Sequence, residues 1–131
     1  MNDERVRQIF DYVADHQEYR LDLRRFLDTL GVDFKGKRVL EAGCGQGLAA
    51  CYLASAKGAG AVLGFDVSPA SIRQAERLKA ELGLPNVVFE VSAIESFRSE
   101  RTFDLVCAFG TLQYVKDYFA CVDHLCGQLG P

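Results

Sequence analysis

The stretch "VLEAGCGQG", residues Val39 to Gly47, decides how this chain folds, because a strand-like run ends there in a cluster of glycines. The apolar run is typical of a buried strand. Gly43, Gly45 and Gly47 allow the next turn to adopt backbone conformations closed to other residues, and they let a ligand approach the backbone. The stretch therefore predicts a ligand site directly after a strand.

Strand-like runs alternate with helical patterns from residue 37 onward. The runs are "KRVLEA", "AVLGFD", "NVVFEV" and "FDLVCAF", at residues 37–42, 61–66, 86–91 and 103–109. Helical patterns lie at 46–57, 68–82 and 117–129, and the second opens on Ser68-Pro69, a favourable cap and first-turn pair. The alternation predicts an α/β fold, a doubly wound parallel sheet that binds ligands at the carboxyl ends of its strands.

Apolar side chains spaced three and four residues apart predict which residues of each helix face the core. After Ser68 they are Ile72, Ala75, Leu78 and Leu82, and in the last helix Tyr118, Val122, Leu125 and Leu129. Near the N-terminus they are Val6, Ile9, Phe10 and Val13, then Leu23, Phe26, Leu27 and Leu30, before Gly31. We divide the chain into an N-terminal helical extension, residues 1–34, and a core domain, residues 35–131.

The composition is that of one ordinary globular domain of 131 residues, with 49% apolar and 25% charged residues. The net charge of −3 gives no electrostatic reason to expect nucleic acid or an anionic membrane as a partner. The N-terminus "MNDERVRQIF" lacks an apolar signal core, and no run is long enough for a membrane helix. Cysteines without a CxxC pair indicate reduced thiols, a cytoplasmic location and no metal site.

Two acidic residues narrow the class of ligand. A dinucleotide fingerprint would place its third small residue at Leu48, and Glu41 would repel a pyrophosphate but attract an ammonium group. A ligand that carries an amine and a sulfonium fits better than NAD. Asp66 ends the second run, where a carboxylate can accept hydrogen bonds from ribose hydroxyls. The alternative for Asp66 is a solvated turn acid that caps the next helix.

The motifs "VLEAGCGQG", "GFDVSPASIRQA", "NVVFEVSAIESF" and "FDLVCAFGTLQYV" together resemble class I S-adenosylmethionine-dependent methyltransferases over residues 35 to 131. The resemblance implies a Rossmann-like sheet in the order 3-2-1-4, with the family's strands five to seven absent. It also implies S-adenosylmethionine as the cofactor and methyl transfer as the reaction. Strand four would then be an open edge, through which two copies of the chain could form a homo-oligomer.

The resemblance also assigns roles to individual residues. The methionyl end of the cofactor is expected at Glu41, Ala42, Gly43, Cys44, Gly45 and Gly47, although Cys44 itself is interpreted as a packing residue. The nucleoside is expected at Asp66, Val67, Ser92, Ala93 and Ile94, and the methyl donor at Phe109 and Gly110. Ser92 stands where relatives often have an aspartate, so its hydrogen bond to adenine would be neutral and weaker.

The acceptor and the catalytic residues are less well defined by the sequence. Methyl transfer mainly requires alignment, so the resemblance implies no universal catalytic residue, and the candidates are Gln113 and Tyr114. The alternative, equally supported, is that Gln113 is solvated and Tyr114 is packed in the protein. "AFGT" replaces the N/D-P-P-Y/F stretch associated with methylation of base and amide nitrogens, so nucleic-acid amino groups are disfavoured as acceptors. The absence of a basic surface favours a small molecule over nucleic acid, and a protein acceptor stays an alternative. The alternatives are a non-catalytic S-adenosylmethionine-binding module, a truncated inactive fragment, and an NAD-dependent oxidoreductase.

Four more side chains receive interpretations of their own. His16 and His124 are expected to be solvated on helix surfaces. Tyr12 and Tyr19 either help an N-terminal lid to close over the cofactor or pack as half-buried tyrosines.

Overall fold

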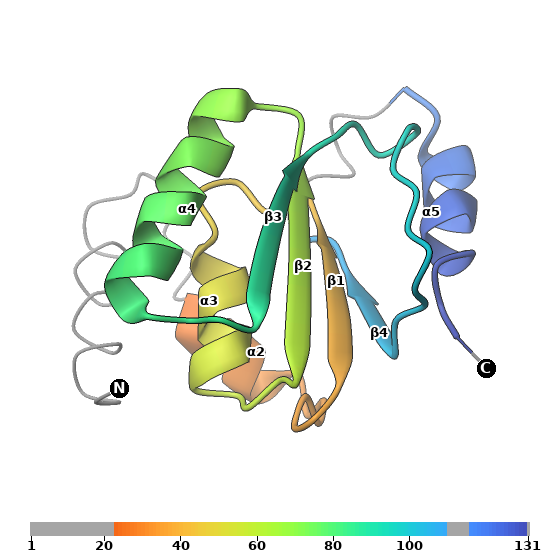
Figure 1. The fold of residues 1–131 in the computed structure, drawn as a ribbon. Coiled ribbons are helices and arrows are strands. Elements are labelled where there is room, and N and C mark those ends of the chain that lie inside the picture. The colour runs from red at the N-terminus through yellow and green to blue at the C-terminus, as the bar shows by residue number, and fades with distance from the viewer. Residues whose placement is uncertain (1–22, 110–115, 131) are drawn as a thin grey trace.

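The computed structural model describes residues 23–109 and 116–130, which form a four-stranded parallel sheet in the order β3-β2-β1-β4 with helices around it (Figure 1). The strands are β1 (Arg38–Ala42), β2 (Ala61–Asp66), β3 (Val87–Val91) and β4 (Leu105–Cys107). The helices are α2 (Leu23–Thr29), α3 (Leu48–Ser55), α4 (Pro69–Leu82) and α5 (Tyr118–Cys126). The predicted doubly wound α/β fold and its strand order are confirmed.

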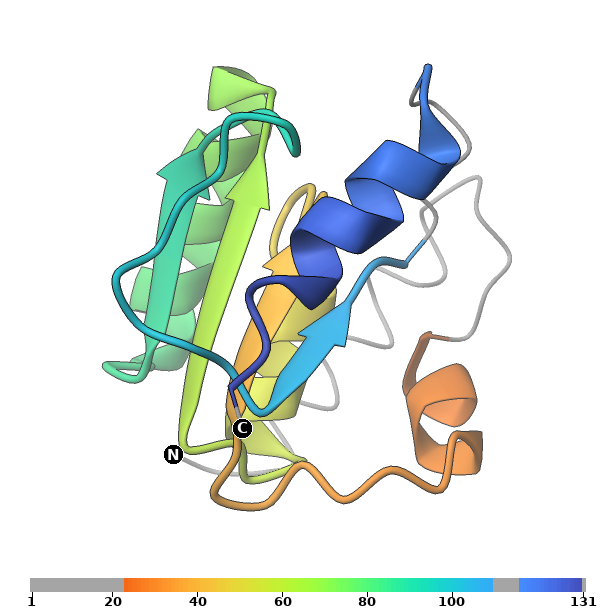
Figure 2. The same ribbon diagram turned by 90° about the vertical axis from the view of Figure 1, so that its right-hand side faces the viewer.

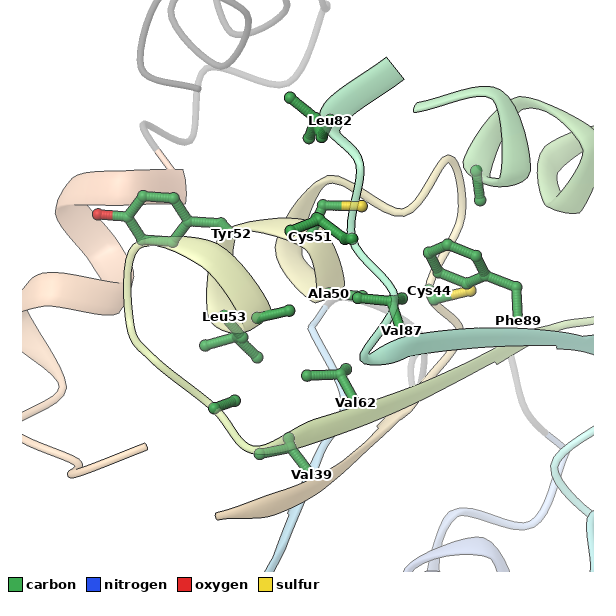
Figure 3. Packing of buried hydrophobic residues seen from close by; sticks show 14 of the residues in the cluster. Val39, Cys44, Ala50, Cys51, Tyr52, Leu53, Val62, Leu82, Val87 and Phe89 are labelled. Carbon is green, nitrogen blue, oxygen red and sulfur yellow. The ribbon is translucent and has the colours of Figure 1, made fainter. Parts of the chain in front are cut away.

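Helices cover both faces of the sheet, with α3 and α4 on one face and α5 on the other (Figures 1 and 2). Each face therefore has its own core. The first is built from Val39, Val62, Val87 and Phe89 of the strands with Ala50 and Leu53 of α3 (Figure 3). The second contains Leu40, Phe65, Phe97, Cys121 and Leu125. Because β1 lies between the two cores, its run is apolar on both sides, as expected for a central parallel strand.

Helix α4 has the boundaries that its sequence signals predict. The Ser68 hydroxyl accepts a hydrogen bond from the Ser71 N–H at 3.2 Å, and Gly83 ends the helix with a φ of 64°. Ile72, Ala75 and Leu82 are buried, and Leu78 packs against the same cluster, as predicted. Local capping chemistry is therefore enough to place this helix.

Loss of the Ser68 cap should have a measurable cost. We expect Ser68→Ala to lower the free energy of unfolding by about 1 kcal/mol, because a first-turn N–H loses its side-chain acceptor. Urea denaturation of the wild type and the variant measures the difference. Ser68→Thr keeps the acceptor and should retain most of the stability, so equal losses in the two variants would contradict the capping role.

Three elements are shorter than the sequence patterns predict. The run at 103–109 gives a strand only at Leu105–Cys107, and the helical pattern at 46–57 gives a helix only at Leu48–Ser55. The predicted burial of Leu129 is wrong, because α5 ends at Cys126 and Leu129 is 42% exposed. Instead, Leu129 forms a parallel bridge with Phe103, beside the start of β4 (Figure 2).

Backbone hydrogen bonds define that bridge. The Phe103 N–H donates to the Gln128 carbonyl at 3.0 Å, and the Gly130 N–H donates to the Phe103 carbonyl at 2.9 Å. The chain after α5 thus covers the entry to β4, and within the described residues the three residues of the strand itself have no second neighbouring strand.

His124 is also not the solvated residue that the sequence predicts. It is half-buried on α5, and its Nε2 atom lies 2.8 Å from the Phe97 carbonyl oxygen and 2.8 Å from Arg98 Nη1. These contacts tie α5 to the segment that follows β3. A surface helix pattern gives no sign of such a partner, because Phe97 and Arg98 are distant in sequence.

Helix α2 packs on the core domain. Leu27 is 1% exposed and lies in the first core. Asp28 accepts a hydrogen bond from the Tyr52 hydroxyl at 3.1 Å, and it forms an ion pair with Lys57 at 2.7 Å. Phe26 and Leu30, which share the predicted apolar face, are 36% and 40% exposed. The division of the chain at residue 34 stays a prediction. Val6 to Val13, Tyr12, His16, Tyr19 and the side chain of Tyr118 lie outside the described residues.

Candidate functional site

The strand register brings the predicted site residues to one edge of the sheet. Glu41 of β1 pairs with Cys107 of β4, and Asp66 of β2 pairs with Val91 of β3. Because the strands are parallel, their carboxyl ends and the loops that follow lie together. The glycine loop, Asp66, Ser92 and Phe109 therefore gather at the same edge, as the sequence predicts.

The loop after β1 needs its glycines. Gly43, Gly45 and Gly47 have φ values of 71°, 54° and 82°, in the left-handed region that favours glycine. The N–H groups of Gly43 and Cys44 donate to the Phe65 carbonyl at 2.8 Å and 2.9 Å, which fastens the start of the loop to β2. A side chain on Gly45 would meet no atom within 4 Å among the described residues, so the middle of the loop faces open space.

Gly47 has a packing role that the sequence analysis missed. A Cβ atom at Gly47 would lie 2.9 Å from Ala75 Cβ and 2.7 Å from Phe89 Cζ, so α3 begins in close contact with α4 and β3. This is the function that a dinucleotide fingerprint gives to its third small residue, one position later. The available signal was a glycine at the start of the helical pattern, the last of the three loop glycines.

Glu41 is a buried carboxyl group without a compensating cation among the described residues. Its side chain is 2% exposed, and Oε2 accepts no hydrogen bond within residues 23–109 and 116–130. Burial, with a smaller contribution from the nearby charge of Asp66, raises the pKa of Glu41 to about 8. The group is therefore mostly protonated at neutral pH, and an incoming ammonium group would stabilise its ionised form.

Asp66 is neither simply solvated nor the cap of α4. Its Oδ2 atom accepts a hydrogen bond from the Gly45 N–H at 2.9 Å, and Oδ1 accepts one from the Ser68 N–H at 2.9 Å. Each carboxylate oxygen has a further lone pair for a ligand hydroxyl. The same side chain can thus brace the glycine loop and accept hydrogen bonds from a ribose.

The expected adenine region combines an exposed apolar side chain with a half-buried polar one. Val67 is 70% exposed, directly after Asp66. The Ser92 hydroxyl donates to the Ala93 carbonyl at 2.9 Å, which commits its proton but leaves its oxygen able to accept. Ile94 is 6% exposed and packs in the second core, so its side chain anchors this region to the core.

Phe109 marks the far side of the site, after β4. Its ring meets the ring of Phe26 edge to face, with 5.9 Å between centroids and 88° between planes. The N-terminal helix α2 therefore borders the edge where the methyl donor is expected. Gly110 and the catalytic candidates Gln113 and Tyr114 lie outside the described residues.

Three cysteines surround Glu41 as neutral packing groups. Burial first, and then the charge of Glu41, raises the pKa of Cys107 to about 12. The same two causes raise the pKa of Cys51 to about 12 and that of Cys44 further still. Cys44 also fills the space above Gly64, beside Phe89 (Figure 3). Cys44 is therefore a packing residue, as predicted, and none of the three thiols is a ready nucleophile.

The donor set suits an amine-bearing nucleoside better than a dinucleotide. The nearby charge of Asp66 would oppose a pyrophosphate at the loop, and the protonated carboxyl group of Glu41 would not attract one. The oxygen of Glu41 that has no partner among the described residues fits an ammonium group. The open space at Gly45 allows a ligand to approach closely, and the exposed side chain of Val67 fits an aromatic ring.

In residues 23–109 and 116–130, no cluster of His, Cys, Asp or Glu is arranged to hold a metal ion. The helices described there are also too short or too polar to cross a membrane.

Comparison with known proteins gives a consistent picture. Residues 33–131 match the family described as a methyltransferase domain. The chain is 28% identical over 129 residues to ribosomal RNA small subunit methyltransferase G of Nitrosococcus oceani, over 97% of this chain and 60% of that protein. It is 32% identical over 95 residues to trans-aconitate 2-methyltransferase of Escherichia coli, over 72% of this chain and 36% of that protein. The chain thus spans less than two thirds of either relative.

A solved structure shares the fold. It is the methyltransferase from Thiobacillus denitrificans in complex with S-adenosyl-L-homocysteine, with a TM-score of 0.70 and 25% sequence identity. The match covers 83% of this chain and 44% of that chain.

Proposed function

Because the chain belongs to the class I S-adenosylmethionine-dependent methyltransferases, we propose that it binds S-adenosyl-L-methionine at the glycine loop and transfers a methyl group to a small-molecule acceptor. The observation that carries the proposal is Glu41, a carboxyl group 2% exposed with an oxygen left without a partner among the described residues. An unsatisfied buried polar group is costly. A ligand ammonium group at this position would remove that cost.

The side chains then have separate tasks around the ligand. Glu41 accepts hydrogen bonds from the ammonium group, Asp66 accepts them from the ribose hydroxyls, and Val67 packs on the adenine. When bound, S-adenosylmethionine supplies an electrophilic methyl group that leaves its sulfur as the bond to the acceptor forms. The contribution of the chain is alignment, which can lower a barrier by about 7–11 kcal/mol. Gln113 and Tyr114 stay proposed as residues that contact the acceptor.

The proposed small-molecule acceptor is supported by the net charge of the chain and by one of its relatives. A net charge of −3 supports a small molecule over RNA, since RNA-binding surfaces are basic. One relative is named for trans-aconitate, which agrees with this choice. The other is named for ribosomal RNA, and it makes RNA the second candidate.

Calorimetric titration of the chain with S-adenosylmethionine, S-adenosylhomocysteine and NAD tests the cofactor proposal. We expect binding of the first two ligands, and a loss of at least about tenfold in affinity in Glu41→Gln, because a charge-assisted hydrogen bond is lost. Glu90→Gln, at an exposed glutamate of β3, is the matched control and should bind as the wild type does.

Three other outcomes are informative. A folded chain that binds NAD but not S-adenosylhomocysteine would contradict the proposal in favour of an oxidoreductase. Binding without methyl transfer to any tested acceptor, small molecules and RNA included, would favour the non-catalytic module or an inactive fragment. Concentration-dependent dimers in sedimentation would support the proposed pairing through the open β4 edge.

A further inference from the structure

Asp66 already has two backbone partners before any ligand enters the site. Its carboxylate holds the Gly45 N–H and the Ser68 N–H, each at 2.9 Å. Gly45 and Asp66 are 21 positions apart, so this bond connects the loop after β1 with the end of β2. The connection spans the two parts of the site, the methionyl side at the loop and the nucleoside side at β2.

The bond acts on the part of the loop that has most conformational freedom. The loop begins with two hydrogen bonds to the Phe65 carbonyl, and it ends at Gly47, which is fixed by close packing on Ala75. Gly45 lies between these anchors with a φ of 54° and open space around it. A charge-assisted hydrogen bond at that point restricts a residue that otherwise has many accessible conformations.

We propose that Asp66 is a positioning residue for the methionyl half of the cofactor site, in addition to its expected contact with the ribose. The proposal rests on the proposed function. It states that the Asp66 carboxylate fixes Gly45 so that the loop and Glu41 meet the amino acid end of the ligand in one arrangement. A residue that served the ribose alone would have no effect on a ligand without a ribose.

Two ligand fragments separate these roles. L-methionine carries the amino acid end without a nucleoside, and methylthioadenosine carries the nucleoside without the amino acid end. We expect Asp66→Ala to weaken the binding of both fragments, each at least about fivefold, as measured by chemical-shift titration. Glu41→Gln should weaken L-methionine alone. If Asp66→Ala weakens methylthioadenosine but leaves L-methionine unchanged, the positioning role is overturned.

Two controls exclude simpler explanations. Asp66→Asn removes the charge but keeps an acceptor oxygen, so positioning predicts partial recovery of L-methionine binding, whereas a pure charge effect predicts equal loss in both variants. Asp117→Ala removes a similar bond, from the Ala120 N–H at 3.0 Å, at the start of α5. It should lower stability without changing the binding of L-methionine.

A ligand-free measurement keeps this inference distinct from the proposed function. Amide hydrogen exchange in the free protein should show Gly45 at least about tenfold less protected in Asp66→Ala, which removes the acceptor, than in the wild type. Unchanged protection overturns the inference even if S-adenosylmethionine binds. Reduced protection in a chain that binds neither S-adenosylmethionine nor its fragments supports the bracing of the loop and contradicts the proposed function instead.

Discussion

Gly47→Ala should destabilise the protein by about 2–5 kcal/mol, which is enough to unfold much of a marginally stable domain. Two costs add at this position. Alanine at a φ of 82° is strained by about 1–2 kcal/mol, because its Cβ crowds the following carbonyl group. The new Cβ would also lie 2.9 Å from Ala75 Cβ and 3.2 Å from Ala75 Cα, so α3 and α4 would have to move apart.

Gly83→Ala isolates the first of these costs, the backbone strain. Gly83 has a φ of 64° at the end of α4, and an added Cβ would meet nothing within 4 Å among the described residues. This variant should therefore show the strain of about 1–2 kcal/mol alone. Urea denaturation with circular dichroism measures both variants, and equal losses would contradict the close-packing role of Gly47.

The stability of the free protein should fall as the pH rises from about 4.5 to about 8, because of Glu41. Its pKa is raised from 4.5 to about 8 in the folded chain, so the unfolded chain releases this proton first. The stabilising contribution is complete below the unfolded pKa and is lost as the pH rises through the folded one. The slope in this window is up to about 1.4 kcal/mol per pH unit.

Denaturation curves at several pH values test this expectation. Glu41→Gln cannot ionise, so its stability should depend less on pH across the same window. Glu90→Gln retains the buried carboxyl group and should keep the slope of the wild type. If the wild type and Glu41→Gln show parallel pH profiles, Glu41 is not the titrating group.

The same group should couple cofactor binding to proton release. Near pH 6.5, binding of S-adenosylmethionine should release about one proton, since Glu41 ionises as the ammonium group arrives. Affinity should rise with pH up to about 8 and then fall, because the ligand α-amino group itself titrates at about 8. Calorimetry in buffers of different ionisation enthalpy counts the protons, and a count near zero in the wild type would contradict the coupling.

The local signals of the sequence predicted the frame of the site well. Ser68-Pro69 placed the start of α4, and "VLEAGCGQG" placed β1 and its left-handed loop, because capping and positive φ depend on neighbouring residues. The sequence also correctly predicted that a helix follows the glycine loop. The predicted helix began two residues too early, since Gly47 still belongs to the loop.

The remaining features depend on tertiary contacts that no local pattern reveals. The near-complete burial of Glu41 depends on segments distant in sequence, and the bond from Gly45 to Asp66 joins the loop after β1 to the end of β2, 21 positions away. Leu129 continues the helical spacing of α5, but the helix ends first and the residue pairs beside Phe103. Periodicity shows which residues could face a core, but it does not show where an element stops.

The all-parallel pairing of the sheet also has a kinetic consequence. Arg38 pairs with Ala61, and Val62 pairs with Val87, so β1, β2 and β3 join segments that are near in sequence. The contact from Arg38 to Asp104, at the entry to β4, joins residues 66 positions apart. Closing that larger loop has the greater entropic cost, so we expect β4 to dock late in folding. The loop, Asp66 and Ser92 would then be assembled in a transient three-stranded species before the side of the site formed by Phe109.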